Sequence, residues 1–240
     1  MLDGSIEPPP PGIHPWVAAG QGRVRLSVLG RQPLAWQVTG YMALQSLLYY
    51  VLLAWLPTIY ADNGLTPVQA GLILAVAQLA QLVACLLVPV LAAMVRDQRA
   101  LAAGFAVLTA IAYLGIAVAP LAAPLLWSVV LGLGQGGALT VALMLIVLRS
   151  PDTASAAGLS AMSQGVGYLV AACGPPLVGM IHDLTGGWMP VLLALTTVCA
   201  VECGVGILAG RNRTVRPAPP TGTAPPDVGT VMNQQAGAGQ

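Results

Sequence analysis

Five glutamines lie inside strongly apolar runs, where polar side chains are costly: Gln45, Gln78, Gln81, Gln135 and Gln164. Gln45 shares a helix face with Tyr49, four residues later. Gln164 has the same relation to Tyr168. A neutral amide both donates and accepts hydrogen bonds, so these seven side chains could line a path for a small polar or anionic solute. For any single glutamine, an interhelical hydrogen bond that only holds the bundle together explains the residue as well.

Glu202 is the one acidic residue well inside an apolar run. Ionisable groups within a membrane span are expensive and often mark functional positions, such as proton carriers. Glu202 precedes Arg211 by about two helical turns, so its carboxylate could instead reach the membrane surface or be covered by a neighbouring helix. A coupling role and a covered structural carboxyl group therefore both stand as hypotheses.

Two other sequence patterns resemble motifs for nucleotide binding and for nucleophilic catalysis, but the residues around them do not support either function. The glycines of 132–137 fit G-x-G-x-x-G, but that nucleotide-binding pattern needs a preceding strand, and here it lies in an apolar run. We interpret these glycines as sites of close helix packing. Ser160 would need a base to act as a nucleophile, and the histidines, His14 and His182, lie outside the expected spans. We therefore expect no enzyme activity.

The cysteines and the overall composition narrow the class of protein further. All four cysteines lie in apolar runs, which is typical of small core residues, so we expect neither a disulfide framework nor a metal or cofactor site. Of the 240 residues, 57% are hydrophobic and 7% are charged, whereas soluble domains carry roughly a quarter charged residues. The chain is predicted to be an integral protein of the lipid bilayer. Its net charge of +1 gives no indication of a nucleic-acid partner.

The apolar runs predict an all-α membrane domain of six spans, each near the roughly 20 residues needed to cross a bilayer. We expect residues 1–33 to be a Pro- and Gly-rich flexible cytoplasmic segment, residues 34–210 to be the six-helix bundle, and residues 211–240 to be a disordered cytoplasmic tail. The expected spans are 34–56, 68–95, 100–118, 124–148, 156–181 and 188–210.

The basic residues predict the orientation of the chain. All nine are arginines, and they fall in the N-terminal segment, the second loop, the fourth loop and the tail, at positions 23, 25, 31, 96, 99, 149, 211, 213 and 216. Six spans place those four regions on one side of the membrane. The positive-inside rule makes that side cytoplasmic, so we expect both termini in the cytoplasm and the bundle in the plasma membrane.

Local signals predict where the helices start, stop and pack. Thr66-Pro67 is typical of a helix start, and Asp152 is placed to cap the fifth helix. The first span is expected to end at Pro57, and Pro175-Pro176 to break or kink the fifth helix. The small residues of 158–176 favour close contact between that helix and its neighbours.

The sequence from about residue 33 to residue 211 resembles the C-terminal half of a major facilitator superfamily transporter. More narrowly, it is similar to the cyanate permease and 2-nitroimidazole transporter family. The residues that carry the resemblance are Leu44-Gln45-Ser46-Leu47, Tyr49-Tyr50, Trp55-Leu56-Pro57, Gly132-Leu133-Gly134-Gln135-Gly136, Leu148-Arg149-Ser150, Leu159-Ser160, Gln164, Gly167-Tyr168 and Gly174-Pro175.

The resemblance implies a fold of two six-helix bundles, in which the first, second, fourth and fifth helices of the C-terminal bundle line the solute cavity. The five glutamines fall in those four helices. The loop 96–99 keeps only a degenerate form of the superfamily's basic motif, and the first bundle is missing. The implied function is alternating-access transport of a small polar or anionic solute such as cyanate or a nitroimidazole, by a truncated or half-length form. Such a form would need a second six-helix bundle, either an N-terminal half or a second copy of this chain. The alternative is a membrane subunit or scaffold that pairs with another bundle without transporting.

Overall fold

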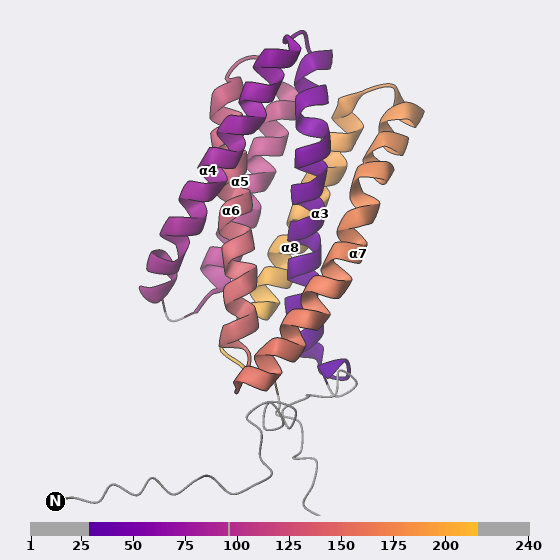
Figure 1. The fold of residues 1–240 in the computed structure, drawn as a ribbon. Coiled ribbons are helices and arrows are strands. Elements are labelled where there is room, and N and C mark those ends of the chain that lie inside the picture. The colour runs from indigo at the N-terminus through magenta and orange to yellow at the C-terminus, as the bar shows by residue number, and fades with distance from the viewer. Residues whose placement is uncertain (1–28, 96, 216–240) are drawn as a thin grey trace, which may run out of the picture.

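The structure, a computed structural model, describes residues 29–95 and 97–215 and contains six long helices in that part of the chain. They are α3 (Pro33–Asp62), α4 (Pro67–Ala93), α5 (Arg99–Val118), α6 (Pro124–Leu148), α7 (Thr153–Thr185) and α8 (Trp188–Ala209). All six are long and apolar enough to cross a membrane. Figure 1 shows them side by side in one bundle. The all-α, six-span fold predicted from the sequence is confirmed.

Most of the closely packed helix pairs are not consecutive in the chain, with α5 and α6 as the exception. Helix α3 lies against α7, α4 against α6, and α5 against both α8 and α6 (Figure 1). Because helices alternate in direction, α3, α5 and α7 begin at the end where α4, α6 and α8 finish. The described arginines all lie at this end, which we call the arginine end: Arg31, Arg99, Arg149, Arg211 and Arg213.

Two glycines of α6 allow α4 and α6 to approach closely. A Cβ atom built on Gly132 would overlap the backbone carbonyl oxygen of Ala77, and one built on Gly136 would overlap that of Gln81. Both glycines lie within one continuous helix. The glycine pattern therefore serves helix packing, as predicted, and it lacks the strand that nucleotide binding requires.

The predicted helix starts are confirmed at α4 and α7. The Thr66 hydroxyl accepts a hydrogen bond from the backbone N–H of Gln69 at 3.3 Å, and the Gln69 side chain accepts one from the backbone N–H of Thr66 at 3.0 Å. Asp152 accepts a hydrogen bond from the backbone N–H of Ser155 at 2.7 Å. These side chains satisfy amide groups that have no partner within the helix.

Helices α3 and α7 both continue through their internal prolines. Helix α3 continues through Pro57 to Asp62, and α7 continues through Pro175 and Pro176 to Thr185. The predicted end of the first span at Pro57 was therefore wrong. The Pro175-Pro176 pair does not break α7, whose span the sequence predicted to run on to residue 181. Neighbouring helices can hold a proline-containing span together, and here the Trp55 indole of α3 donates a hydrogen bond to the Pro175 carbonyl at 2.9 Å.

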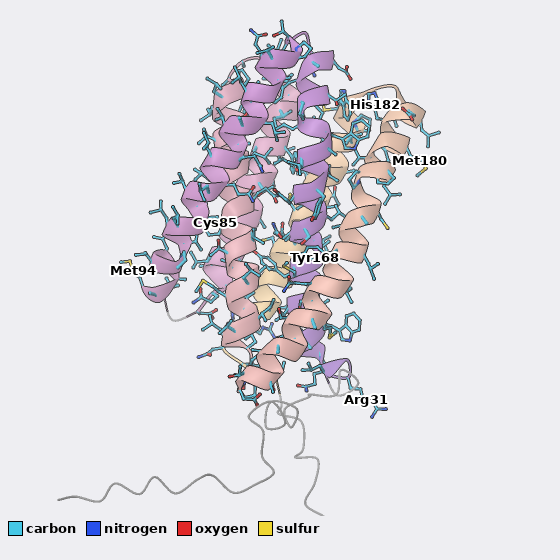
Figure 2. The ribbon with its side chains drawn as sticks, in the orientation of Figure 1. Arg31, Cys85, Met94, Tyr168, Met180 and His182 are labelled. Carbon is cyan, nitrogen blue, oxygen red and sulfur yellow. The ribbon has the colours of Figure 1, made fainter. Side chains whose placement is uncertain are left out.

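The longer α7 also changes the interpretation of His182, which lies in its last turn rather than in a loop. The His182 ring stacks on Trp188 with the ring centroids 4.0 Å apart. The Trp188 indole in turn donates a hydrogen bond to the Asp62 carboxylate at 2.9 Å. These contacts join α3, α7 and α8 at the end opposite the arginine end, where Figure 2 shows His182.

Arg149 joins α6 to α8 at the arginine end. Its side chain is 4% exposed, and it donates hydrogen bonds to the carbonyl oxygens of Ala209 at 3.1 Å and Gly210 at 2.9 Å. The Arg149 carbonyl accepts a hydrogen bond from the backbone N–H of Val215 at 2.8 Å. Burial lowers the pKa of the Arg149 guanidinium, and the Asp97 carboxylate acts in the opposite direction. A cation at the C-terminus of α8 also complements the dipole of that helix.

Gly132→Ala should lower the free energy of unfolding by about 1–3 kcal/mol, because the added methyl group meets backbone that cannot move without separating α4 from α6. The matched control is Gly204→Ala in α8, where nothing lies within 4 Å of the added Cβ. The control should be neutral or stabilising by up to about 1 kcal/mol. Reversible unfolding in mixed micelles measures both, and equal effects would contradict the close-packing assignment.

Candidate functional site

A line of polar and aromatic contacts crosses from α4 over α3 to α7. The Gln78 amide donates a hydrogen bond to the Tyr49 hydroxyl at 3.1 Å. The Tyr49 and Tyr50 rings meet edge to face with centroids 5.5 Å apart. Tyr50 meets Tyr168 of α7 in the same manner at 6.4 Å. Three helices therefore contribute to one connected set of side chains.

On α7 the line continues along one helix face, as the spacing predicted. The Tyr168 hydroxyl donates to the side-chain Oε1 atom of Gln164 at 3.4 Å, and the Gln164 side-chain Nε2 atom donates to the Ser160 hydroxyl at 2.6 Å. Tyr50 and Tyr168 are 41% and 48% exposed. Figure 2 shows Tyr168 about midway along α7. This polar face lies in the middle of a hydrophobic span and is not covered by the six helices.

The other three glutamines occupy different surroundings. Gln45 and Gln135 are 1% and 0% exposed. Gln135 finds no partner for either end of its amide among the described residues, and neither does the Gln45 Nε2 atom. Gln81 is half-buried, with an unpaired Oε1 atom. The predicted path residues thus divide into two sets. Tyr49, Gln78, Gln164 and Tyr168 are linked by contacts, and we call them the exposed set after Tyr168, although the other three are half-buried. Gln45, Gln81 and Gln135 form the inner set, whose amides each have an unpaired atom among the described residues.

Close contact between α3 and α7 brings the exposed set together. The Thr39 and Ser163 hydroxyls lie 3.1 Å apart across this interface, and both residues are buried. A Cβ atom on Gly174 would come within 2.9 Å of Val51. Small residues therefore let α7 approach α3 closely enough for Tyr168 to reach Tyr50.

Four residues of this region were missed as site or interface residues by sequence reasoning. Tyr50 and Ser160 extend the exposed line, whereas Thr39 and Ser163 hold α3 to α7. The doubled tyrosine at 49–50 was the available signal for Tyr50. No sequence signal pairs Thr39 with Ser163, because 124 positions separate them.

Glu202 is covered rather than reaching the membrane surface. It is 0% exposed, and neither carboxyl oxygen has a hydrogen-bond partner among the described residues. Gly206, on the same face of α8, packs against Tyr41 of α3 and Ala102 of α5. Glu202 therefore faces the α3–α5–α8 interface, away from the line formed by α4, α3 and α7.

The arrangement supplies amides, hydroxyls and aromatic edges but no full positive charge. All five described arginines lie at the arginine end, and the described chain contains no lysine. Amide groups can donate to or accept from a neutral solute, and aromatic rings pack against planar ones edge to face or offset. These groups can bind and orient a small polar molecule, and they include no nucleophile–base pair.

Gln135→Met should raise the free energy of unfolding by about 1–3 kcal/mol, because it replaces an unpaired buried amide with an apolar side chain of similar length. The contrasting variant is Gln78→Met, which removes the hydrogen bond to Tyr49 and should lower that free energy by about 0.6 kcal/mol. Unfolding in mixed micelles measures both. Loss of stability in Gln135→Met would mean that its amide is satisfied in the folded bundle.

Comparison with known proteins finds transporters. The E. coli K12 2-nitroimidazole transporter is 40% identical over 186 residues, which are 78% of this chain and 47% of that protein. The E. coli K12 cyanate transport protein CynX is 33% identical over 184 residues, covering 77% and 47% of the two chains. A putative anionic 4-hydroxy-benzoate permease of Thauera aromatica is 42% identical over 100 residues, covering 42% of this chain and 61% of that protein.

The chain spans about half the length of the two E. coli transporters that it matches. The family model described as Major Facilitator Superfamily matches residues 38–231. This range covers all six helices except the first five residues of α3. With six apolar helices and this match, the chain is a multi-pass membrane protein that belongs to the Major Facilitator Superfamily.

Proposed function

We propose that this chain is one half of a secondary carrier that moves a small polar solute across the plasma membrane by alternating access. The observation that carries the proposal is the exposed line of Gln78, Tyr49, Tyr50, Tyr168 and Gln164 in the middle of a hydrophobic bundle. Polar groups facing hydrocarbon are penalised, so this face requires a cover. A second six-helix bundle would cover it and enclose the solute between the two halves.

The solute path in this proposal includes the seven residues predicted from the sequence. Tyr49, Gln78, Gln164 and Tyr168 contact the solute at the interface of the two bundles. Gln45 and Gln135 are buried and Gln81 is half-buried, and their amide atoms without partners among the described residues support a role in binding rather than in packing. The relatives are named for 2-nitroimidazole, cyanate and 4-hydroxy-benzoate. We propose a solute of this class for the completed carrier.

Glu202 is the candidate for ion coupling within this proposal. A buried carboxyl group without a cation is far less costly when neutral than when ionised. Binding or release of a proton at Glu202 can therefore favour one packing of α8 on α3 and α5 over another. Its place away from the exposed line suits a proton site rather than a solute contact.

The second candidate is a membrane subunit that pairs with another bundle but does not transport. The same exposed face favours it, since a partner bundle satisfies the polar groups whether or not a solute passes. The half-length match to the E. coli transporters is compatible with both candidates.

A chimaera distinguishes the two candidates. In it, residues 34–215 replace the second half of the E. coli 2-nitroimidazole transporter. The carrier proposal expects saturable uptake of 2-nitroimidazole into cells that express the chimaera, and none into cells that express this chain alone. A chimaera that reaches the membrane at normal levels without uptake would favour the scaffold.

Gln164→Leu in the same chimaera tests the path assignment, because it removes the amide at similar size. Uptake should fall at least about tenfold, the loss of roughly 1.4 kcal/mol of solute interaction, with the amount of membrane-inserted protein unchanged. The matched control is Thr197→Val, on the exposed side of α8, which should leave uptake near normal. Loss of Gln164→Leu from the membrane would identify Gln164 as a packing residue.

The proposed orientation places the arginine end and both termini in the cytoplasm. In a background without the four native cysteines, Leu121→Cys marks the exposed α5–α6 turn and Asn212→Cys marks the arginine end. An impermeant thiol reagent added to intact cells should label Leu121→Cys at once and Asn212→Cys only after permeabilisation. The reverse pattern would overturn the orientation.

A further inference from the structure

We infer that the arginine end carries a binding site for a phosphate group, separate from the proposed solute path. A cavity of about 470 Å³ lies where the segment before α3 meets the segment after α8. Three of its lining residues are arginines: Arg31, Arg211 and Arg213. Its lining also includes Gln32, Gln37 and Thr214, which carry hydrogen-bonding groups, and none of the described residues that line it is acidic.

The segment before α3 holds Arg31 in a fixed place. Leu29 is 0% exposed within a buried hydrophobic cluster, and the carbonyl of Leu29 accepts a hydrogen bond from the backbone N–H of Gln32 at 2.9 Å. The Trp36 indole donates to the Gly30 carbonyl at 2.8 Å. The backbone on both sides of Arg31 is therefore tied to the bundle, while its side chain extends from the end of the bundle in Figure 2.

The segment after α8 is fixed at both ends. Arg149 binds the carbonyls of Ala209 and Gly210 at its start. Val215, 1% exposed, packs into the hydrophobic cluster that contains Leu29, and its backbone N–H bonds to the Arg149 carbonyl at 2.8 Å. Arg211 and Arg213 lie between these two anchors, so the cavity is formed by ordered backbone.

The charges in this cavity are not neutralised within the described chain. The one ion pair among the described residues joins Arg99 to Asp97, at 2.9 Å, and neither residue lines the cavity. Helix α3 begins at the cavity, without a side-chain cap and without an acidic residue in its first turn. The positive end of its dipole therefore adds to the three guanidinium charges. The negative end of α8 lies at the same cavity, but Arg149 already binds its last two carbonyls. Within the described chain these three guanidinium groups have no anionic partner, and a bound anion would supply one.

A phosphate group suits this site better than a carboxylate or a halide. Guanidinium groups bind phosphate oxygens through paired N–H donors, and three of them can neutralise a group that offers several acceptors. Leu34 and Leu208 line the same cavity, and Trp36 beside it is 50% exposed. Apolar and aromatic groups next to a basic pocket at a helix end are typical of the membrane surface. The phosphodiester of an acidic phospholipid is therefore the expected source, and soluble phosphate is the other.

The test uses the full purified chain in neutral detergent, with tryptophan fluorescence reporting its thermal unfolding midpoint. Phosphatidylglycerol, phosphatidylcholine and inorganic phosphate are titrated separately at constant ionic strength. Phosphatidylglycerol should raise the midpoint, and phosphatidylcholine should raise it far less. The triple variant Arg31→Gln/Arg211→Gln/Arg213→Gln should need roughly a hundredfold more phosphatidylglycerol, about fivefold for each charge removed.

Two further variants keep the test decisive. Arg99→Gln removes one arginine from the same end outside the cavity and should respond like the native chain. The corresponding triple lysine variant keeps the charge but not the paired donors, and it should bind between the native chain and the glutamine variant, even if the glutamine variant does not fold.

The arms of the titration separate the two sources. Stabilisation by inorganic phosphate alone would assign the site to soluble phosphate, and stabilisation by phosphatidylglycerol alone would assign it to lipid. Equal responses of the native, lysine and glutamine chains would overturn the site, as would an equal effect of phosphatidylcholine and phosphatidylglycerol or an equal loss in Arg99→Gln.

Discussion

A peptide group inside a bilayer has no water with which to form a hydrogen bond, so every break in a helix must be compensated by another part of the protein. Four prolines lie inside the spans: Pro57, Pro89, Pro175 and Pro176. Each removes one backbone N–H and frees a carbonyl one turn earlier. The helices nevertheless continue through these prolines. At the paired prolines of α7, the Trp55 indole of α3 donates to the Pro175 carbonyl and ties the two helices together.

The same constraint separates the polar side chains of the bundle into two kinds. Thr39 and Ser163 lie within hydrogen-bond distance of each other and join α3 to α7. Gln135 and Glu202 are equally buried but find no partner among the described residues. Pairs of the first kind explain how the helices stay together. Buried polar groups without a partner lower the stability of the bundle and form no hydrogen bond between helices. This pattern is expected where binding has been favoured over stability.

The sequence predicted those features that depend on one helix at a time. The six spans, the caps at Thr66 and Asp152, and the shared face of Gln164 and Tyr168 all follow from composition and from periods of three to four residues. Helix continuity through Pro57 was not predicted, because the support comes from neighbouring helices. Chain periodicity also gives no information on which neighbour a face meets. The Tyr50–Tyr168 contact and the burial of Glu202 therefore became visible only once the helices were placed together.

The contact between Arg149 and the end of α8 can form only after α8 has been synthesised. The guanidinium and its carbonyl partners are separated by 60 and 61 positions in the chain. At a synthesis rate of about 5–20 residues per second, roughly 3–12 s pass between their emergence from the ribosome. Until α8 arrives, a charged side chain that the finished bundle buries must remain hydrated or be held by lipid headgroups or insertion factors. The arginine end is thus completed last, because a chain that stalls before α8 lacks the two carbonyls that bind the Arg149 guanidinium.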